Sequence, residues 1–501
     1  MASKKLSFFL GAAVDLMGIP VTMFLSFVMV PLYLRHIEAA EFGYWSATLE
    51  ATQFASLLWI SFDYFLIQSV SGKIDQPEEL SQDLSESVVV VLIWASLSVL
   101  LVALVVWVHP QLLEQIGFQA FSGLISLMAL WAVLRSLRHL LTSCLIGQNR
   151  MPLVNGIGLL GTALFQVLPY VYLQFGWGLL SFGLGYLSAF VLLLSLEASQ
   201  VGGFFLAHFK PQLVRLSGVK SLLGFSFQTF TSKFSQHAYT YINIFVIAQL
   251  LGAAAIAVYV LSLKLTNFSK FIVPRISAIG FPSYARLLAE GNLERMGEVL
   301  LKLYRFSLRF GLLLSGSIFF LNGVFVAHWV GAEQYAGFTF TLLAAAFCFK
   351  ESLVAIFYQT VFATREITWA NRVIVFEALL NLGLAYVMGQ YWGVTGVLAA
   401  TLISTGLAST SYLVFKSLQL AGLRLSDLIT TSPAVLLKSL PSLAALYGGA
   451  WLLELQFDWW LLIATVALAG LLNLLFFEAR LAFELRHLGP KEILKEMIER
   501  S

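Results

Sequence analysis

Apolar segments long enough to cross a lipid bilayer recur along the whole chain. A crossing helix needs about 20 mostly apolar residues, and its backbone polar groups must be hydrogen-bonded within the segment because lipid offers no partners. Turn signals such as "FGWG" and "GQYWG" separate these segments. The pattern predicts an all-α polytopic membrane protein of about 14 transmembrane helices. The predicted spans are residues 8–34, 43–70, 85–108, 119–146, 153–174, 178–197, 221–249, 253–281, 303–328, 337–362, 367–388, 394–416, 435–454 and 459–483.

The lysine and arginine residues between these spans predict the orientation of the chain. With the N-terminus in the cytoplasm, the cytoplasmic loops and tails contain 16 of them, and the external loops contain one, Arg35. Cytoplasmic loops of membrane proteins carry such an excess of positive charge. One miscounted span would exchange the two sides for every later loop. We therefore expect an even number of spans and both termini in the cytoplasm.

Composition narrows the classes of function. The 501 residues are 59% hydrophobic and 11% charged, whereas soluble domains average about 25% charged residues. The two cysteines, Cys144 and Cys348, lie far apart in apolar segments, which favours small buried side chains over a disulfide framework or a metal site. The chain has no G-x-x-x-x-G-K-[ST] motif and no loop large enough for a soluble catalytic domain. We expect no catalytic residue, no cofactor, no metal and no nucleic-acid partner.

Three short matches at a nearly constant offset indicate an internal repeat. The offsets are 215, 216 and 215 residues. The matched positions are Tyr44 with Tyr259, Asn155 with Asn371, and Trp177-Gly178 with Trp392-Gly393. A six-helix unit returns the chain to the same side, so the two copies would be parallel lobes. The repeat predicts an N-lobe (1–200), a cytoplasmic linker (201–220), a C-lobe (221–420), and a segment with two extra helices and the cytoplasmic tail (421–501).

This 6+6+2 arrangement resembles the polysaccharide flippases of the MOP superfamily, which also holds the MATE drug exporters and the lipid II flippase. The segment "VPLYLRHIEAAEFGYWSATLE" between the first two spans and the glycine-rich twelfth span add to the resemblance. It implies a V-shaped bundle in the bacterial cytoplasmic (inner) membrane. The implied function is to move a polyprenyl-pyrophosphate-linked oligosaccharide, such as an O-antigen, capsule or exopolysaccharide repeat unit, to the outer leaflet by alternating access. The implied partners are this substrate, membrane lipids and polysaccharide assembly proteins.

Basic residues inside the predicted spans are the main candidates for function. A charged side chain at the centre of the bilayer costs about 2.5–3.5 kcal/mol on insertion scales. Arg135, Arg138 and His139 share one helix face by their spacing, and Lys264 and Arg275 share another. These positions predict a cationic central cavity for an anionic headgroup. Its proposed substrate-binding residues are Arg135, Arg138, Lys233, Lys264, Lys270, Arg275 and Lys350. For Arg138, Arg275 and Arg372 the alternative is a side chain that extends to the cytoplasmic interface.

The seventh predicted span carries a polar stripe at helical spacing. It consists of Thr229, Ser232, Lys233, Gln236, Thr240 and Asn243. Since a polar stripe facing lipid is unfavourable, we expect it to line a wet cavity, where it would contact sugar hydroxyls. Three acids in spans, Asp15, Asp63 and Glu377, are candidates for ion coupling, with fixed ion-pair partners as the alternative. Lys350 and Glu351 are neighbours on one helix, so they point in different directions and need not pair.

Other classes of function remain open at this stage. A MATE-like proton- or sodium-coupled exporter of cationic drugs should have an acidic cavity, whereas basic residues outnumber acids in these spans. A membrane polymerase or ligase would need a large external loop, and the external loops here are about ten residues or shorter. A scramblase-like transporter without energy coupling is the third alternative.

Overall fold

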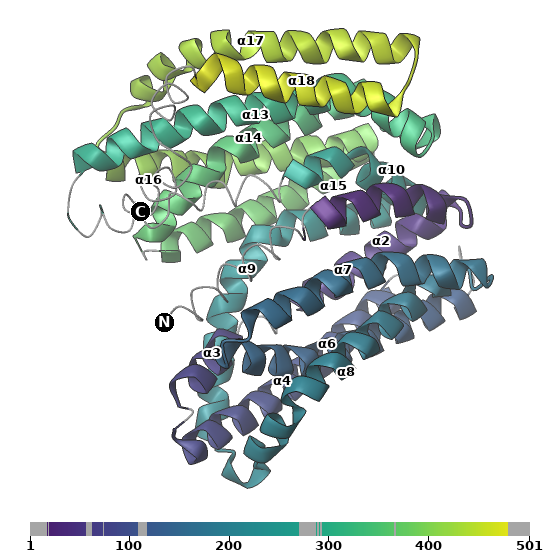
Figure 1. The fold of residues 1–501 in the computed structure, drawn as a ribbon, viewed down its shortest axis with the longest axis vertical. Coiled ribbons are helices and arrows are strands. Elements are labelled where there is room, and N and C mark those ends of the chain that lie inside the picture. The colour runs from purple at the N-terminus through teal and green to yellow at the C-terminus, as the bar shows by residue number, and fades with distance from the viewer. Residues whose placement is uncertain are drawn as a thin grey trace. The chain divides into compact units, whose positions relative to one another are not determined.

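The computed structural model describes residues 20–56, 63–73, 75–108, 118–269, 293–364 and 367–478, and the single residues 18, 287 and 290. Every regular element in these ranges is a helix, which confirms the all-α class (Figure 1). An apolar helix over Pro20–Leu34 comes first. The helices that follow are α2 (Ala39–Ser56), α3 (Asp63–Gly72), α4 (Pro77–Val108), α6 (Phe118–Gly147), α7 (Met151–Gln174), α8 (Leu180–His208), η1 (Pro211–Leu213), α9 (Leu216–Leu250), α10 (Ala253–Ser262), α13 (Leu293–Trp329), η2 (Ala332–Gln334), α14 (Phe338–Ala363), α15 (Ile367–Thr405), η3 (Gly406–Thr410), α16 (Ser411–Ala421), α17 (Leu425–Leu455) and α18 (Trp459–Glu478).

Many of these helices have the length and hydrophobicity of membrane spans. Among the described residues, eight helices are long and apolar enough to cross a membrane, and shorter apolar helices accompany them. The predicted spans 119–146 and 153–174 match α6 and α7 closely. The predicted span 43–70 corresponds to α2 and α3, with residues 57–62 outside the described part. The chain is a multi-pass helical membrane protein, and the count of 14 spans stays a prediction.

Gly393 separates two predicted spans that α15 joins. Its backbone has φ 57° and ψ −142°, which is not helical and which a residue without a Cβ adopts readily. The turn lies at the "GQYWG" signal, between the predicted spans 367–388 and 394–416. Gly178, the glycine matched to Gly393 by the repeat, also has a positive φ of 51°. Both glycines follow an exposed tryptophan, Trp177 and Trp392.

Helix ends follow local sequence signals. Pro77 opens α4, where its missing N–H is not needed, and Glu78 and Glu79 place negative charge at the positive end of the helix dipole. Gly422 ends α16 in the left-handed conformation. The Asp427 side chain accepts a hydrogen bond of 2.8 Å from the Arg424 N–H at the start of α17.

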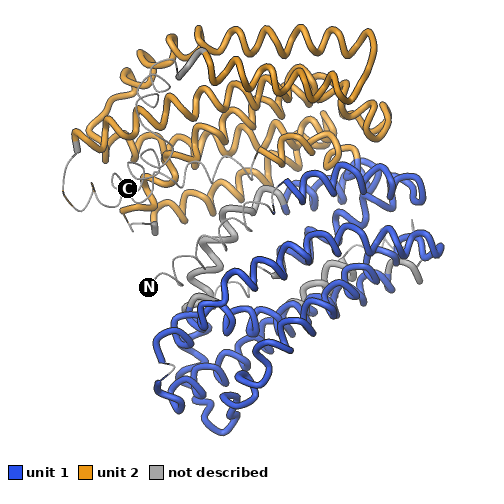
Figure 2. Tube along the Cα trace, viewed as in Figure 1, with its two compact units in different colours: residues 1–257 blue, residues 258–501 orange. Residues whose placement is uncertain are grey.

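The chain forms two compact units, residues 1–257 and 258–501 (Figure 2). In unit 1, α8 packs against both α6 and α7. The approach of α7 to α8 depends on Gly185, because a Cβ there would lie 2.5 Å from the backbone nitrogen of Pro169. A core of buried side chains, including Leu84, Leu140 and Cys144, joins α4 and α6 in this unit.

In unit 2, α13 packs against α14 and α17, and α17 pairs with α18. Its core includes Leu300, Phe357 and Leu413. Cys348 is buried like Cys144, as the sequence indicated, and the two thiols do not form a disulfide. The lobe bounds inferred from the repeat, 1–200 and 221–420, stay a prediction.

Candidate functional site

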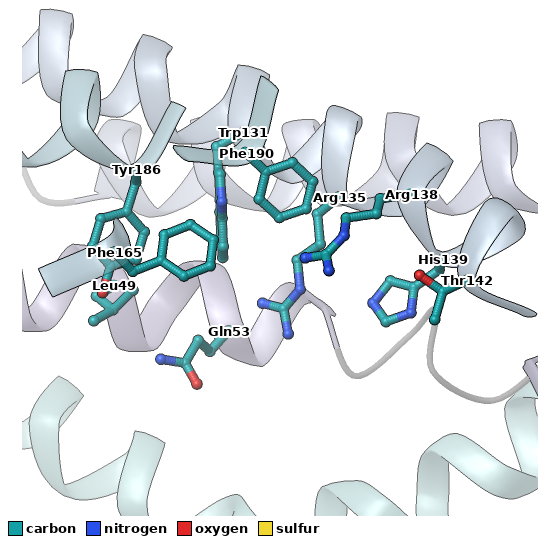
Figure 3. Close-up of a pocket in the computed structure, with 10 residues that line it drawn as sticks. All are labelled: Leu49, Gln53, Trp131, Arg135, Arg138, His139, Thr142, Phe165, Tyr186 and Phe190. Carbon is teal, nitrogen blue, oxygen red and sulfur yellow. The ribbon is translucent and has the colours of Figure 1, made fainter. Parts of the chain in front are cut away.

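A cavity of about 380 Å³ lies inside unit 1 among α2, α6, α7 and α8 (Figure 3). Pockets for small ligands commonly measure about 300–1,000 Å³, so this one is small. Its lining combines basic, polar and aromatic side chains. The lining residues are Leu49, Gln53, Trp131, Arg135, Arg138, His139, Thr142, Phe165, Tyr186 and Phe190. None of these ten residues has a carboxylate.

Helix α6 supplies half of the lining from one face. Trp131, Arg135, Arg138, His139 and Thr142 recur at intervals of three and four residues, which places them in one column along the helix. The shared face of the two arginines and the histidine was predicted from the same spacing. Figure 3 shows these side chains along the same cavity.

Both guanidinium groups lie near aromatic rings. The Cζ atom of Arg135 is 5.0 Å from the ring centre of Trp131, and that of Arg138 is 5.3 Å from the ring centre of Phe190. A planar guanidinium at such a distance is attracted to the negative face of the ring. The rings therefore restrict the orientation of both cations in the cavity.

Arg138 is also held by a buried carboxylate, Glu197 of α8. Its Nε and Nη2 atoms lie 2.9 and 2.8 Å from Oε1 of Glu197, and the Thr142 hydroxyl donates to Oε2 at 2.9 Å. Glu197 is completely buried. The Arg138 side chain is thus directed to α8 within unit 1. The alternative of a side chain that extends to the cytoplasmic interface stays open. Sequence reasoning missed Glu197, which ends the predicted span 178–197; a lone acid in "LLLSLEASQ" was the available signal.

A second acid, Glu50 of α2, belongs to the surroundings of the cavity. Glu50 and Arg135 both act electrostatically on the hydroxyl groups of Tyr186 and Tyr241, so these four side chains share one neighbourhood. Glu50 was not among the acids singled out from the sequence. The positive charge of the cavity is therefore offset by carboxylates that lie outside its lining.

The polar stripe of the seventh predicted span falls on α9. The backbone there is helical, as expected. The side chains of residues 225–240, which include Thr229, Ser232, Lys233, Gln236 and Thr240, lie outside the described residues. Asn243 is described and is buried, and it is not part of the cavity lining. The function of the stripe stays a prediction.

The remaining basic candidates belong to the second half of the chain. Lys270 and Arg275 lie outside the described residues. Lys264 is half-buried in unit 2, with its Nζ 5.7 Å from the ring centre of Phe268. These residues are not in the lining of the unit 1 cavity. A single cavity lined by basic residues from both lobes therefore stays a prediction.

Lys350 and Glu351 form an ion pair within α14. Their Nζ and Oε1 atoms are 2.6 Å apart, so the expectation that these sequence neighbours need not pair is corrected. The Lys350 ammonium also donates to the Thr405 hydroxyl at 2.8 Å and lies 4.8 Å from the ring centre of Phe347. A long, flexible lysine side chain can bend back along the helix to its neighbour, which spacing alone does not exclude.

Glu377 lies beside a π-helical turn in unit 2. The Ser409 N–H of η3 donates to its Oε2 atom at 3.1 Å, and Lys350 acts on it electrostatically. Glu377 is buried, and Asn381, one turn further, accepts a hydrogen bond from Ser404 at 3.2 Å. π-helical turns are rare and frequently occur at functional sites. The other two acid candidates are not described: Asp15 and the side chain of Asp63 lie outside the described residues.

The connection between α8 and α9 packs against the N-terminal half of α4. The Lys210 N–H donates to the Ser85 hydroxyl at 2.8 Å, and the Arg215 N–H donates to Glu86 at 3.1 Å. The close approach requires Gly218, since a Cβ there would lie 2.0 Å from a Glu86 carboxylate oxygen. Ser85 and Glu86 of α4 thus anchor the connection between α8 and α9.

The same half of α4 holds Lys73. Its ammonium is 2.8 Å from Asp83 and 3.4 Å from Glu79. Hydrogen bonding to Asp83 raises the pKa of Lys73, and partial burial opposes this effect. The pair ties the end of α3 to α4.

The charged cavity thus lies within a unit of a multi-pass helical membrane protein. Several solved structures have similar folds. One is a lipid II flippase MurJ in an inward closed conformation, with a TM-score of 0.63, 15% identity and coverage of 96% of this chain and 99% of that chain. Another is an inward-facing multidrug resistance MATE transporter of the MOP superfamily, with a TM-score of 0.60, 13% identity and coverage of 85% of this chain and 99% of that chain.

The sequence profile of the polysaccharide biosynthesis protein family matches residues 34–333. The match covers more than half of the chain, so the chain belongs to this family. No curated protein matches the chain.

Proposed function

We propose that the protein is a flippase that moves a polyprenyl-pyrophosphate-linked oligosaccharide from the inner to the outer leaflet of the bacterial cytoplasmic membrane. The family supports a lipid-linked substrate in polysaccharide biosynthesis. The observation that carries the proposal is the pair Arg135 and Arg138, which line a cavity inside a helical membrane unit whose ten lining residues have no carboxylate. A guanidinium can bind two phosphate oxygens at once, which suits it to a pyrophosphate.

In this proposal the headgroup enters the cavity and the polyprenyl chain stays in the bilayer. The phosphates would contact Arg135, Arg138 and His139, and the Gln53 and Thr142 side chains offer hydrogen bonds to hydroxyl groups. Transport would proceed by alternating access, with an ion gradient acting through Glu377, Asp15 or Asp63. The proposal gives the protein no catalytic step, places both termini in the cytoplasm, and includes polysaccharide assembly proteins as further partners.

A MATE-like exporter of cationic drugs is the second candidate, because the fold is shared with MATE transporters. In that case the carboxylates near the cavity, Glu50 and Glu197, would bind the drug. Glu197 argues against this function, since both of its oxygens are already hydrogen-bonded by Arg138 and Thr142.

The test is reconstitution in liposomes with a fluorescent prenyl-pyrophosphoryl sugar. Arg135→Gln combined with Arg138→Gln should lower the flipping rate at least about tenfold, the equivalent of 1.4 kcal/mol. Arg150→Gln, at an exposed arginine of the same unit, is the matched control and should leave the rate unchanged. Unchanged flipping in the double variant, or export of a cationic dye in place of lipid flipping, would refute the proposal.

A further inference from the structure

The cavity of unit 1 has two chemically different ends. Figure 3 shows Arg135, Arg138, His139 and Thr142 toward one side, with Phe165 and Tyr186 toward the other. The charged end is explained by the proposed phosphate binding. The aromatic end is not, because a phosphate gains nothing from the negative face of an aromatic ring.

The aromatic end is a fixed wall built from two helices. Phe165 of α7 and Tyr186 of α8 are half-buried, and their ring centres are 4.9 Å apart with planes inclined by 36°. Beside them in the lining, Trp131 meets Tyr186 edge-on at 5.9 Å, and Phe190 lies 6.0 Å from Phe165. The Phe165 and Tyr186 rings are therefore held by packing and need no rearrangement to present a surface to a ligand.

Hydrogen-bonding groups flank this wall. Gln53 of α2 lines the cavity with its amide. The Trp131 indole N–H is buried and has no hydrogen-bond partner among the described residues, whereas buried indole N–H groups usually have one. Leu49 is the single aliphatic residue among the ten that line the cavity. A lining of rings and polar groups is poorly suited to a polyprenyl chain. Such a chain gains nothing by leaving the bilayer, whose acyl chains already solvate it.

We propose that Phe165 and Tyr186 form a sugar subsite that holds the sugar ring next to the pyrophosphate. A hexose has C–H groups on its ring faces and hydroxyl groups around its edge. The C–H face packs on the negative face of an aromatic ring, and the edge is left for groups such as Gln53. The inference rests on the proposed function for the phosphate at the other end of the cavity.

The dimensions of the cavity limit what the subsite recognises. At about 380 Å³ the cavity is near the lower bound of about 300 Å³ for small-ligand pockets. It can take the part of the headgroup adjacent to the phosphates and not a long oligosaccharide. The subsite therefore selects lipids that carry a sugar next to the pyrophosphate. The more distant sugars of the oligosaccharide do not contact these residues.

The experiment measures binding to the full-length protein in lipid nanodiscs that contain no alkyl-glycoside detergent. The probes are a prenyl pyrophosphate, the same lipid carrying one hexose, and a neutral alkyl glucoside. The wild type should bind the hexose-linked lipid about tenfold more tightly than the sugar-free lipid, a difference of 1.4 kcal/mol. Phe165→Leu should bring this ratio close to one and leave the affinity for the sugar-free lipid within about twofold.

Further variants separate the sugar subsite from a purely structural effect. Phe165→Tyr retains an aromatic face and should keep the tenfold ratio even if Phe165→Leu folds poorly. Phe175→Leu, at an exposed ring just after α7, is the control and should leave both affinities unchanged. Arg135→Gln should weaken the binding of both lipids by the same factor, because Arg135 lies at the charged end of the cavity, where both lipids place their phosphates.

The outcomes distinguish the subsite from the proposed function. Equal affinity of the wild type for the two lipids, or an equal loss for both in Phe165→Leu, overturns the sugar subsite. If prenyl pyrophosphate does not bind but the alkyl glucoside binds in a way that Phe165→Leu abolishes, the subsite stands and the proposed function fails. If neither the glucoside nor the hexose-linked lipid depends on Phe165, the subsite is overturned.

Discussion

Arg138 and Glu197 form an ion pair across α6 and α8, with two guanidinium nitrogens within 2.9 Å of one carboxylate oxygen. The pair fixes the position of one of the two arginines that line the unit 1 cavity. The Glu197 carboxylate is fully buried, and its second oxygen accepts a hydrogen bond from the Thr142 hydroxyl. Both oxygens of this buried carboxylate therefore have hydrogen-bond partners. The Nη1 atom of Arg138 has no hydrogen-bond partner among the described residues and can donate to a ligand.

Glu197→Ala should destabilise the protein by about 3 kcal/mol, because it leaves the Arg138 charge partly buried without its partner. Thermal unfolding in nanodiscs measures the effect. The double variant Glu197→Ala/Arg138→Met removes both charges and should recover part of the loss. Glu298→Gln, at an exposed carboxylate of α13, is the control and should change stability by less than about 0.5 kcal/mol. A Glu197→Ala protein as stable as the wild type would contradict a structural ion pair.

Gly185→Ala and Gly156→Ala should have opposite effects on stability. A Cβ at position 185 would lie 2.5 Å from the Pro169 nitrogen and push α7 and α8 apart. A Cβ at position 156 meets nothing within 4 Å, so alanine there should stabilise α7 by about 0.5–1 kcal/mol through its lower backbone entropy. The two thermal midpoints, compared with that of the wild type, provide the test. A neutral Gly185→Ala would show that the two helices are not closely packed.

The Lys73–Asp83 pair predicts a dependence of stability on alkaline pH. Its hydrogen bond raises the folded-state pKa of Lys73 above the ordinary 10.5. The stabilisation is therefore fully present below pH 10.5 and is lost as the pH rises through the raised pKa. The difference in thermal midpoint between the wild type and Lys73→Gln should be constant from pH 7 to pH 9 and should shrink above pH 10.5. A difference that persists unchanged in strong alkali would assign the effect to packing.

Glu377→Gln tests the proposed coupling to an ion gradient. The amide oxygen can still accept the Ser409 N–H, so the π-helical turn η3 should remain, while the negative charge is removed. We expect flipping to lose its response to an imposed proton or sodium gradient, with headgroup binding retained. Glu454→Gln, at an exposed carboxylate of α17, should respond like the wild type. Full gradient dependence in Glu377→Gln would exclude this residue from coupling.

Hydrophobic patterning was enough to predict the helices but not their true ends. The predicted span 435–454 is part of α17, which starts at Leu425 and runs through Pro433 and Pro441. In the structure, Ser432 donates to the Leu428 carbonyl at 2.8 Å beside this site, and serine and threonine side chains of this kind help proline to be tolerated inside membrane helices.

Spacing predicted which residues of one helix share a face, and it could not predict partners on other helices. Arg135, Arg138 and His139 share the face that their intervals require. Glu197 and Glu50 come from α8 and α2, and their positions beside the arginines depend on the packing register of those helices with α6. The aromatic wall also joins residues of α7 and α8 that no interval within one helix connects.

The most direct measurement of the central claim is substrate protection of a cysteine in the cavity. Gln53→Cys, on α2, should react with a water-soluble maleimide, since Cys144 and Cys348 are buried. Saturating prenyl-pyrophosphoryl sugar should slow labelling at position 53 at least about tenfold. Labelling of Gln200→Cys, at an exposed position in the C-terminal half of α8, should not change. If the lipid is flipped while labelling at position 53 is unaffected, the headgroup does not pass through this cavity.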